Sequence, residues 1–234
     1  MTMTTTRFKH HARLRGLLLA TALTVASAPA FAVKPFTADY QASYMGMQAT
    51  ARMTLVAAGN NRWRYNLSIS NSLADLSQST VFEEHAGQWR PLSGTDSTKV
   101  LIKKTNKVAD YNWSSGVASW SGDMKPNRKG PIKLQSGDMD ALLINLALVR
   151  DVAAGKPLSY RMVEDGRVKQ MNYTVAGKEA IEIGGKSQQA TKVVSSDGDK
   201  QTIAWVVEGM PVPARILQRE NGEVSIDLRV RSVR

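Results

Sequence analysis

The sequence predicts a mainly β fold: an antiparallel meander curled into an open or incomplete barrel or spiral around one buried α-helix at about residues 138–150. Three observations support this class. Short segments that alternate between apolar and polar residues recur along most of the chain. Turn signals rich in glycine separate these segments at short intervals. One segment breaks the pattern, because its apolar residues follow one another almost without interruption.

The alternating segments have the period of two that is typical of half-buried strands. In RWRYNLSIS, the residues Trp63, Tyr65 and Leu67 fall on one face, and polar residues fall on the other. EVSIDLRV repeats this pattern near the C-terminus, directly after Asn221-Gly222. An Asn-Gly pair between two such runs predicts a hairpin, because both turn residues take a positive φ.

Further turn signals divide the rest of the chain into short strands. They are Gly59-Asn60-Asn61, Ser115-Gly116, Glu164-Asp165-Gly166, Ala176-Gly177, Gly184-Gly185 and Asp197-Gly198. Many short strands joined by local turns indicate an antiparallel meander with one buried and one solvated face. A sheet of this many strands has to curl. The connection at 123–137 carries several prolines and glycines, and we expect it to be a loop.

The segment MDALLINLALVR is apolar on nearly every side, so a helix here must be buried on every side. Asp138 is the expected N-cap, with Asp140 in the first turn. Arg150 lies where the helix dipole favours a cation, and Gly155 with Pro157 prevents continuation. We therefore expect the sheet to wrap around this helix.

The N-terminus has the pattern of a secretory signal peptide. Its basic residues are Arg7, Lys9, Arg13 and Arg15. An apolar stretch at 16–28 and the small-residue motif Ala30-Phe31-Ala32 follow. The stretch is shorter than the ~20 residues of a membrane-spanning helix, which argues against the alternative of an uncleaved anchor. We expect Sec export, cleavage after Ala32 and a single β-rich periplasmic domain at 33–234, with no membrane span.

The chain carries 31 basic and 20 acidic residues, a formal charge of +11, and no cysteine. The absence of cysteine excludes disulfides, thiol catalysis and thiolate metal sites. Outside the cytoplasm we expect no nucleic acid partner; anionic lipid headgroups, other anionic envelope components or an envelope protein fit better. The alternative is that the charge only maintains solubility. The sequence does not indicate an oligomeric state.

Catalytic and metal-binding motifs are scarce. His85 is the only histidine after the leader, and its place before a glycine-containing turn indicates a surface residue. IGGKS at 183–187 resembles the end of a P-loop but lies at a predicted hairpin. Asp138 and Asp140 could serve as an acid–base pair, but capping a helix is the favoured role. We assign no catalytic residue, metal site or cofactor.

The densest positive charge lies between residues 99 and 133. The candidate binding residues there are Lys103, Lys104, Lys107, Arg128 and Lys129. They could recognise phosphate or carboxylate groups of an envelope molecule. The alternative is a solvated strand face on which lysines prevent edge-to-edge association.

Four blocks carry a resemblance to a known family. They are ADYQASYMGMQATARMTL, QWRPLSGT, SGDMDALLINLALVRDVAAGKPLSYRMVEDGR and VPARILQRENGEVSIDL. Their order and spacing, from about Ala38 to Leu228, resemble the bacterial exported family called domain of unknown function 3108. The resemblance implies a β-rich periplasmic domain with no established activity, and it transfers no catalytic residues.

Three functions remain open from the sequence. The first is a non-enzymatic periplasmic protein that binds a lipid-like molecule or another envelope component. The second is a scaffold or interaction protein for envelope integrity. The third is a carboxylate-dependent hydrolase that uses residues such as Asp138 or Asp140.

Overall fold

The computed structural model describes residues 34–44 and 46–234, together with Met1. Val33–Arg234 forms one compact unit. The hydrophobic core of this unit draws on residues from Phe36 to Val230, so this part of the chain has a core of its own. The predicted signal peptide lies outside the described residues, apart from Met1.

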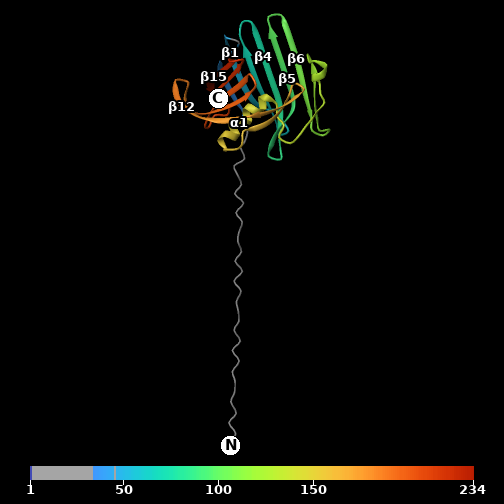
Figure 1. The fold of residues 1–234 in the computed structure, drawn as a ribbon, viewed down its shortest axis with the longest axis vertical. Coiled ribbons are helices and arrows are strands. Elements are labelled where there is room, and N and C mark those ends of the chain that lie inside the picture. Colours follow the sequence, from blue (N-terminus) through green and yellow to red (C-terminus); the bar gives the residue numbers. More distant parts are fainter. Residues whose placement is uncertain (2–33, 45) are drawn as a thin grey trace. The chain divides into compact units, whose positions relative to one another are not determined.

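The predicted class, an open antiparallel meander with one helix, is confirmed. A single sheet of thirteen strands has the order β11-β12-β13-β14-β15-β1-β2-β3-β4-β5-β6-β7-β8, and all neighbours are antiparallel. Within residues 34–44 and 46–234 its edge strands, β11 and β8, do not pair, so the sheet curls without closing (Figure 1). The strands of this sheet are β1 (Phe36–Tyr44), β2 (Met47–Ala57), β3 (Arg62–Ser70), β4 (Ala74–His85), β5 (Gln88–Val100), β6 (Lys103–Asn112), β7 (Val117–Gly122), β8 (Ile132–Lys133), β11 (Thr174–Ile183), β12 (Lys186–Asp197), β13 (Lys200–Val207), β14 (Arg215–Glu220) and β15 (Glu223–Val233).

Three elements stand apart from this sheet. Strands β9 (Ser159–Glu164) and β10 (Arg167–Asn172) pair with each other as a separate hairpin. The helix α1 (Ala141–Ala153) precedes them. A short 3-10 helix, η1 (Pro126–Arg128), and β8 lie in the connection at 123–137, which is therefore less irregular than predicted.

Most predicted turns are confirmed as hairpins. Asn221 and Gly222 both have positive φ, 53° and 81°, which is the geometry that favours an Asn-Gly pair. The prediction of a turn at Ala176-Gly177 is wrong. β11 runs through this point, and a bulge between Val175 and Gly177 absorbs the glycine. A lone glycine within an alternating segment marks a bulge as readily as a turn.

The helix is buried, as its composition predicts. Leu143, Ala147 and Leu148 have no exposed surface, and they pack in the same cluster as the inward side chains of the sheet. The helix ends as predicted near Gly155, whose φ is 61°. The N–H groups of Gly155 and Lys156 donate to the carbonyls of Val152 and Asp151, which satisfies the last turn.

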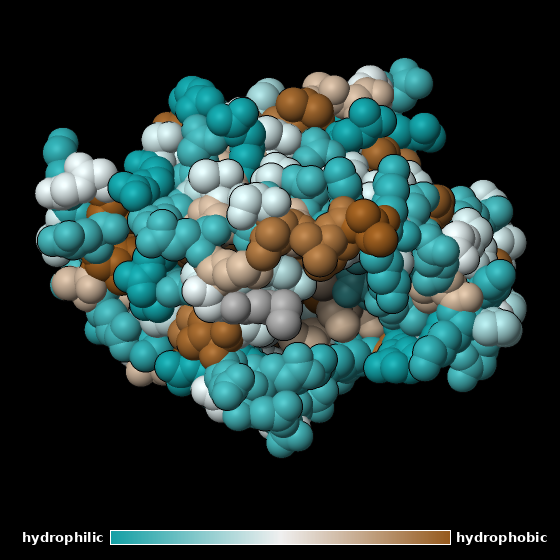
Figure 2. Space-filling view, turned by 90° about the horizontal axis from the view of Figure 1, so that it is seen from above, coloured by the Kyte–Doolittle hydropathy of each residue, from teal (hydrophilic) through white to brown (hydrophobic). Residues whose placement is uncertain are grey.

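The helix covers only one end of the concave face, the face on which Tyr65 and Phe82 are buried. At its start, Asp140 contacts Thr80 in the middle of β4. At its end, the Arg150 guanidinium lies 4.4 Å from the ring centre of Trp89, beside the β4–β5 turn. The register of the strands places the β1–β2, β3–β4 and β5–β6 turns at the opposite end. There the surface is hollowed (Figure 2).

Candidate functional site

The helix N-terminus faces the end of the concave face that the helix leaves uncovered. Asp140 is its N-cap: one carboxylate oxygen accepts from the Leu143 N–H at 2.8 Å. The other accepts from the Thr80 hydroxyl at 2.6 Å, which ties the helix start to β4. The prediction that Asp138 caps the helix is therefore wrong. The helix itself is confirmed, with bounds of Ala141–Ala153 instead of about 138–150.

Asp138 has a different structural role. It is fully buried, and one of its oxygens accepts from the Gln135 N–H and pairs with Arg161 of β9. Its other oxygen has no hydrogen-bond partner among the described residues. The ion pair fixes the β9–β10 hairpin beside the helix start, so both aspartates named for a hydrolase are occupied by structural contacts.

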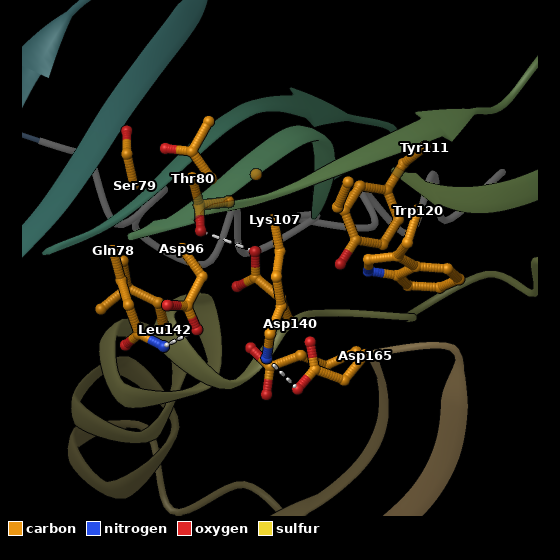
Figure 3. A pocket seen from close by; sticks show the side chains of 14 residues that line it. Gln78, Ser79, Thr80, Asp96, Lys107, Tyr111, Trp120, Asp140, Leu142 and Asp165 are labelled. Carbon is orange, nitrogen blue, oxygen red and sulfur yellow. Dashed lines mark hydrogen bonds and ion pairs between the residues drawn. The ribbon is translucent and has the colours of Figure 1, made fainter. Parts of the chain in front are cut away.

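A small acidic pocket lies at the helix N-terminus (Figure 3). It has a volume of about 40 Å³ and is lined from β4, β5, β6, β7, the helix start, the end of β9 and the β9–β10 turn. Burial and the nearby Asp140 and Asp165 carboxylates raise the pKa of Glu164 from 4.5 to about 8, although the Ala141 N–H opposes this shift. Burial also raises the pKa of Asp140, against the bonds from Thr80 and Leu143.

Lys107 is the cation of this pocket. Its ammonium lies 2.8 Å from the Asp165 carboxylate, and both side chains are partly exposed. Burial alone would lower the pKa of Lys107, but the ion pair with Asp165 outweighs it and the pKa is raised. A space of this size holds about one or two water molecules. The acidic pocket is therefore too small for an organic substrate.

A larger cavity adjoins it and shares Glu164. We call it the cleft; it has a volume of about 240 Å³ and lies between the helix start, the β9–β10 hairpin and the strands β13, β14 and β15. Its lining residues are Ala141, Ile144, Asn145, Met162, Glu164, Lys169, Met171, Tyr173, Lys200, Gln201, Thr202, Gln218, Arg219, Glu220 and Ser225. The cleft is thus bounded by the helix, the curled sheet and the separate hairpin.

The cleft is amphipathic. Met162 and Met171 come from the β9–β10 hairpin, and Ile144 comes from the helix. Methionine side chains are flexible and fit ligands of different shapes. The charged members are Lys169, Lys200, Arg219, Glu164 and Glu220. Lys169 pairs with Asp197 at 2.6 Å, and Lys200 pairs with Glu220 at 3.0 Å. Arg219 has no ion pair within the part of the chain that the structure describes.

A wider hollow of about 440 Å³ is a weaker candidate. It is lined from β1, β2 and β3, mostly by polar side chains such as Thr50, Ser68 and Ser70. Asp39 and Arg52 are paired across it at 2.6 Å. Because adjacent strands of one sheet line it, no second element encloses a ligand there. The cleft is enclosed from three sides, and we take it as the candidate functional site.

The basic residues predicted to bind a ligand do not form one site. The register places Lys103 and Lys107 on the concave face, opposite Val100 and Asp96. Lys104 points to the outer face. The remaining two, Arg128 and Lys129, lie at the end of η1. Of the five, only Lys107 lines one of the two adjoining cavities.

Sequence reasoning missed the residues of the cleft. Glu164 was interpreted as a turn residue, and Lys169, Lys200 and Arg219 lie far apart in the sequence. One signal was present: LSYRMVEDGRVKQMNY alternates methionines with charged residues across a short turn. Such a hairpin presents an apolar face with charged residues at its ends, but its position over the sheet depends on tertiary contacts.

Within residues 34–44 and 46–234, no helix is both long and apolar enough to cross a membrane. The same residues contain no cluster of three or more histidine, aspartate or glutamate side chains arranged to hold a metal ion.

Comparison with known proteins identifies the family. No curated protein matches the sequence. Among solved structures, the fold is similar to a "beta-barrel-like protein of domain of unknown function DUF1849 from Brucella abortus", with 14% identity and a TM-score of 0.46 over 85% of this chain and 96% of that chain. It is also similar to MucB, with 9% identity and a TM-score of 0.35 over 86% of this chain and 52% of the MucB chain. The sequence model described as "protein of unknown function (DUF3108)" matches residues 39–229, most of the chain, and the chain belongs to this family.

Proposed function

We propose that the protein is a non-enzymatic binding protein that holds a small anionic amphiphile in the cleft. The observation that carries this proposal is the cleft itself, a cavity of about 240 Å³ left between the helix and the sheet. Its walls combine an apolar surface from Met162, Met171 and Ile144 with the cations Lys169, Lys200 and Arg219. An apolar chain and an anionic headgroup need this combination of contacts.

The volume restricts the class of ligand. Small-molecule sites usually enclose about 300–1,000 Å³. The cleft lies just below this range, so it suits one short acyl chain or one end of a longer amphiphile. A whole phospholipid with two chains would have to extend beyond the cleft. We therefore expect single-chain amphiphiles to bind better than two-chain lipids of the same headgroup.

The charge of the cleft favours an anion. Lys169 and Lys200 each have an acidic partner, whereas Arg219 has none among the described residues. The raised pKa of Glu164 reduces the negative charge that this residue adds to the cleft near neutral pH. Arg219 is therefore the expected contact for a carboxylate or phosphate group.

The predicted export signal indicates that the proposed amphiphile binding would take place in the periplasm. After cleavage behind Ala32 the domain would reach the periplasm. The scaffold alternative requires no cavity. The hydrolase alternative requires free carboxylates, whereas Asp138 and Asp140 are bound to Arg161 and Thr80.

The test is to purify the protein from cells without detergent, extract it with organic solvent and identify bound molecules by mass spectrometry. A fluorescent single-chain fatty acid then gives the affinity of the emptied protein. The double variant Lys200→Gln and Arg219→Gln is expected to bind about tenfold more weakly, since each loses a charged contact. Lys178→Gln with Lys186→Gln is the matched control, because both of these lysines are exposed and neither lines the cleft.

Two results would contradict the proposal. In one, no amphiphile co-purifies and the fluorescent fatty acid does not bind. In the other, the cleft variant and the control bind equally, which would place the ligand elsewhere.

A further inference from the structure

The tip of the β5–β6 hairpin exposes a run of large apolar side chains. Val100, Leu101 and Ile102 are 41%, 63% and 101% exposed. Leu73 of the neighbouring β3–β4 turn is 44% exposed, and its carbonyl accepts from the Leu101 N–H at 2.9 Å. The four side chains therefore form one patch, which we call the apolar tip. Hydrophobic residues are visible among hydrophilic ones when the molecule is viewed from above (Figure 2).

The backbone conformation of the apolar tip does not favour the residues that occupy it. Leu101 has a φ of 53°, in the left-handed region that bulky side chains rarely adopt. A hairpin turn with positive φ at its first central residue favours glycine there, as at Gly198 of the β12–β13 turn. Leucine at this position is strained, and because it is exposed it gains no packing in return. A strained residue without a structural benefit indicates a function at that position.

Positive charge surrounds the apolar tip. Lys99, Lys103 and Lys104 flank it on both strands, and all three are exposed. None of them makes an ion pair within residues 34–44 and 46–234. In the paired segments 73–76 and 98–105 the only acidic residue is Asp75. Apolar residues flanked by lysines are the arrangement that binds the interface of an anionic bilayer.

We infer that the apolar tip is a membrane-docking element that inserts into a bilayer containing anionic lipid. Leu101 and Ile102 enter the boundary between headgroups and acyl chains, and the lysines contact the phosphates. Two turns of the cleft strands, β12–β13 and β14–β15, lie at the same end of the sheet as the β5–β6 turn. A docked protein thus presents this end of the sheet to the membrane, although docking itself requires no ligand in the cleft.

The experiment uses residues 33–234, which contain the entire core. The chain has no cysteine, so Ile102→Cys provides a unique site for an environment-sensitive fluorophore. We expect its emission to shift to the blue with vesicles of phosphatidylglycerol and phosphatidylethanolamine, and to shift little with pure phosphatidylcholine. Val175→Cys is the matched control, because Val175 is 61% exposed but lies on β11. No blue shift at position 102, or an equal shift at both positions, would overturn the inference.

Binding is measured independently by flotation of unlabelled protein with the same vesicles. Leu101→Gly with Ile102→Ser places glycine at the position of positive φ, so this turn variant is expected to fold at least as stably as the wild type. Its vesicle affinity should fall about tenfold or more. Lys103→Gln with Lys104→Gln should lose about tenfold in vesicle affinity, and added salt should weaken the binding of this variant less than that of the wild type, because only Lys99 remains beside the tip. Wild-type flotation by the turn variant would refute the role of the tip.

The cleft variant separates the two proposals. Lys200→Gln with Arg219→Gln should float with anionic vesicles as the wild type does. The turn variant should still bind the fluorescent fatty acid in solution. If the turn variant remained folded but no longer bound the fluorescent fatty acid, the tip would belong to the ligand site. The inference of a separate docking element would then fail.

Discussion

The substitution Glu164→Gln should make the protein more stable at alkaline pH. Burial and neighbouring carboxylates raise the pKa of Glu164 to about 8 in the folded state. In the unfolded chain the same group ionises near its ordinary value of 4.5. Between these values the folded protein binds a proton that the unfolded chain has released, so stability falls as pH rises from 4.5 to about 8. Glutamine keeps the shape of the protonated side chain and cannot ionise.

The size of this loss of stability follows from the folded and unfolded pKa values of Glu164. An interval from 4.5 to about 8, at ~1.36 kcal/mol per pH unit, corresponds to ~4.8 kcal/mol of lost stability at high pH. Glu164 as a residue is only partly buried, so water screens part of this cost. We expect Glu164→Gln to gain about 2 kcal/mol over the wild type at pH 8.5 and nothing at pH 4.5.

The assay is urea unfolding of residues 33–234 at several pH values from 4.5 to 8.5. The pKa of Asp140 is also raised, so this residue too lowers the stability of the protein as the pH rises. Asp140 is present in both proteins, so its effect cancels in the comparison. Asp39, Glu179 and Asp227 have lowered pKa values, so their contributions are complete within about one pH unit above their ordinary values of 3.8 and 4.5 and are the same in both proteins. Glu182→Gln is the exposed control. Parallel curves for the wild type and Glu164→Gln would refute the reasoning.

Three further predictions concern the same end of the helix. Asp140→Ala should cost about 2 kcal/mol in urea unfolding, because the cap and the Thr80 partner are both lost, while Asp140→Asn should cost less; equal costs would contradict the capping role. Arg161→Ala should cost about 3 kcal/mol by leaving Asp138 charged and unpaired, and adding Asp138→Asn should recover part of this loss; an additive double variant would show that the two residues are not coupled. Binding of an anionic fatty acid should weaken as pH rises through about 8 in the wild type but not in Glu164→Gln; the same pH dependence in both would exclude Glu164 as its cause.

The sheet could be predicted because its signals are local. Alternation fixes which residues of a strand face the core, and short turns pair each strand with the next. All neighbours in the thirteen-stranded sheet follow chain order except β15 with β1. The error at Ala176-Gly177 has the same local origin, since a glycine alone does not distinguish a turn from a bulge.

The helix start could not be predicted, because two aspartates competed for the cap. Asp138 and Asp140 both precede an apolar run, and either could accept a bond from a free helix N–H. Contacts far away in the sequence decide between them: Thr80 of β4 holds Asp140, and Arg161 of β9 holds Asp138. No periodicity in the sequence reports these contacts.

The candidate site could not be predicted either, because it too depends on contacts between residues that are far apart in the sequence. The basic residues between 99 and 133 are dense in sequence, but pleating and η1 distribute them over different surfaces. The cations of the cleft, Lys169, Lys200 and Arg219, are sparse in sequence and become neighbours only when the β9–β10 hairpin folds over β13 and β14. Charge density along the chain is therefore a poor guide to charge density in a concave sheet.

The cleft follows from a mismatch in length between the helix and the sheet. At ~1.5 Å per residue, the 13 residues of α1 span about 20 Å. At ~3.3 Å per residue, the 13 residues of β5 span about 43 Å. One helix can therefore cover only about half of the concave face. The polar cap at Asp140 and the break at Gly155 prevent extension in either direction. The uncovered half is occupied by the β9–β10 hairpin and by the cleft that this hairpin leaves, which is why the candidate site lies at the helix N-terminus.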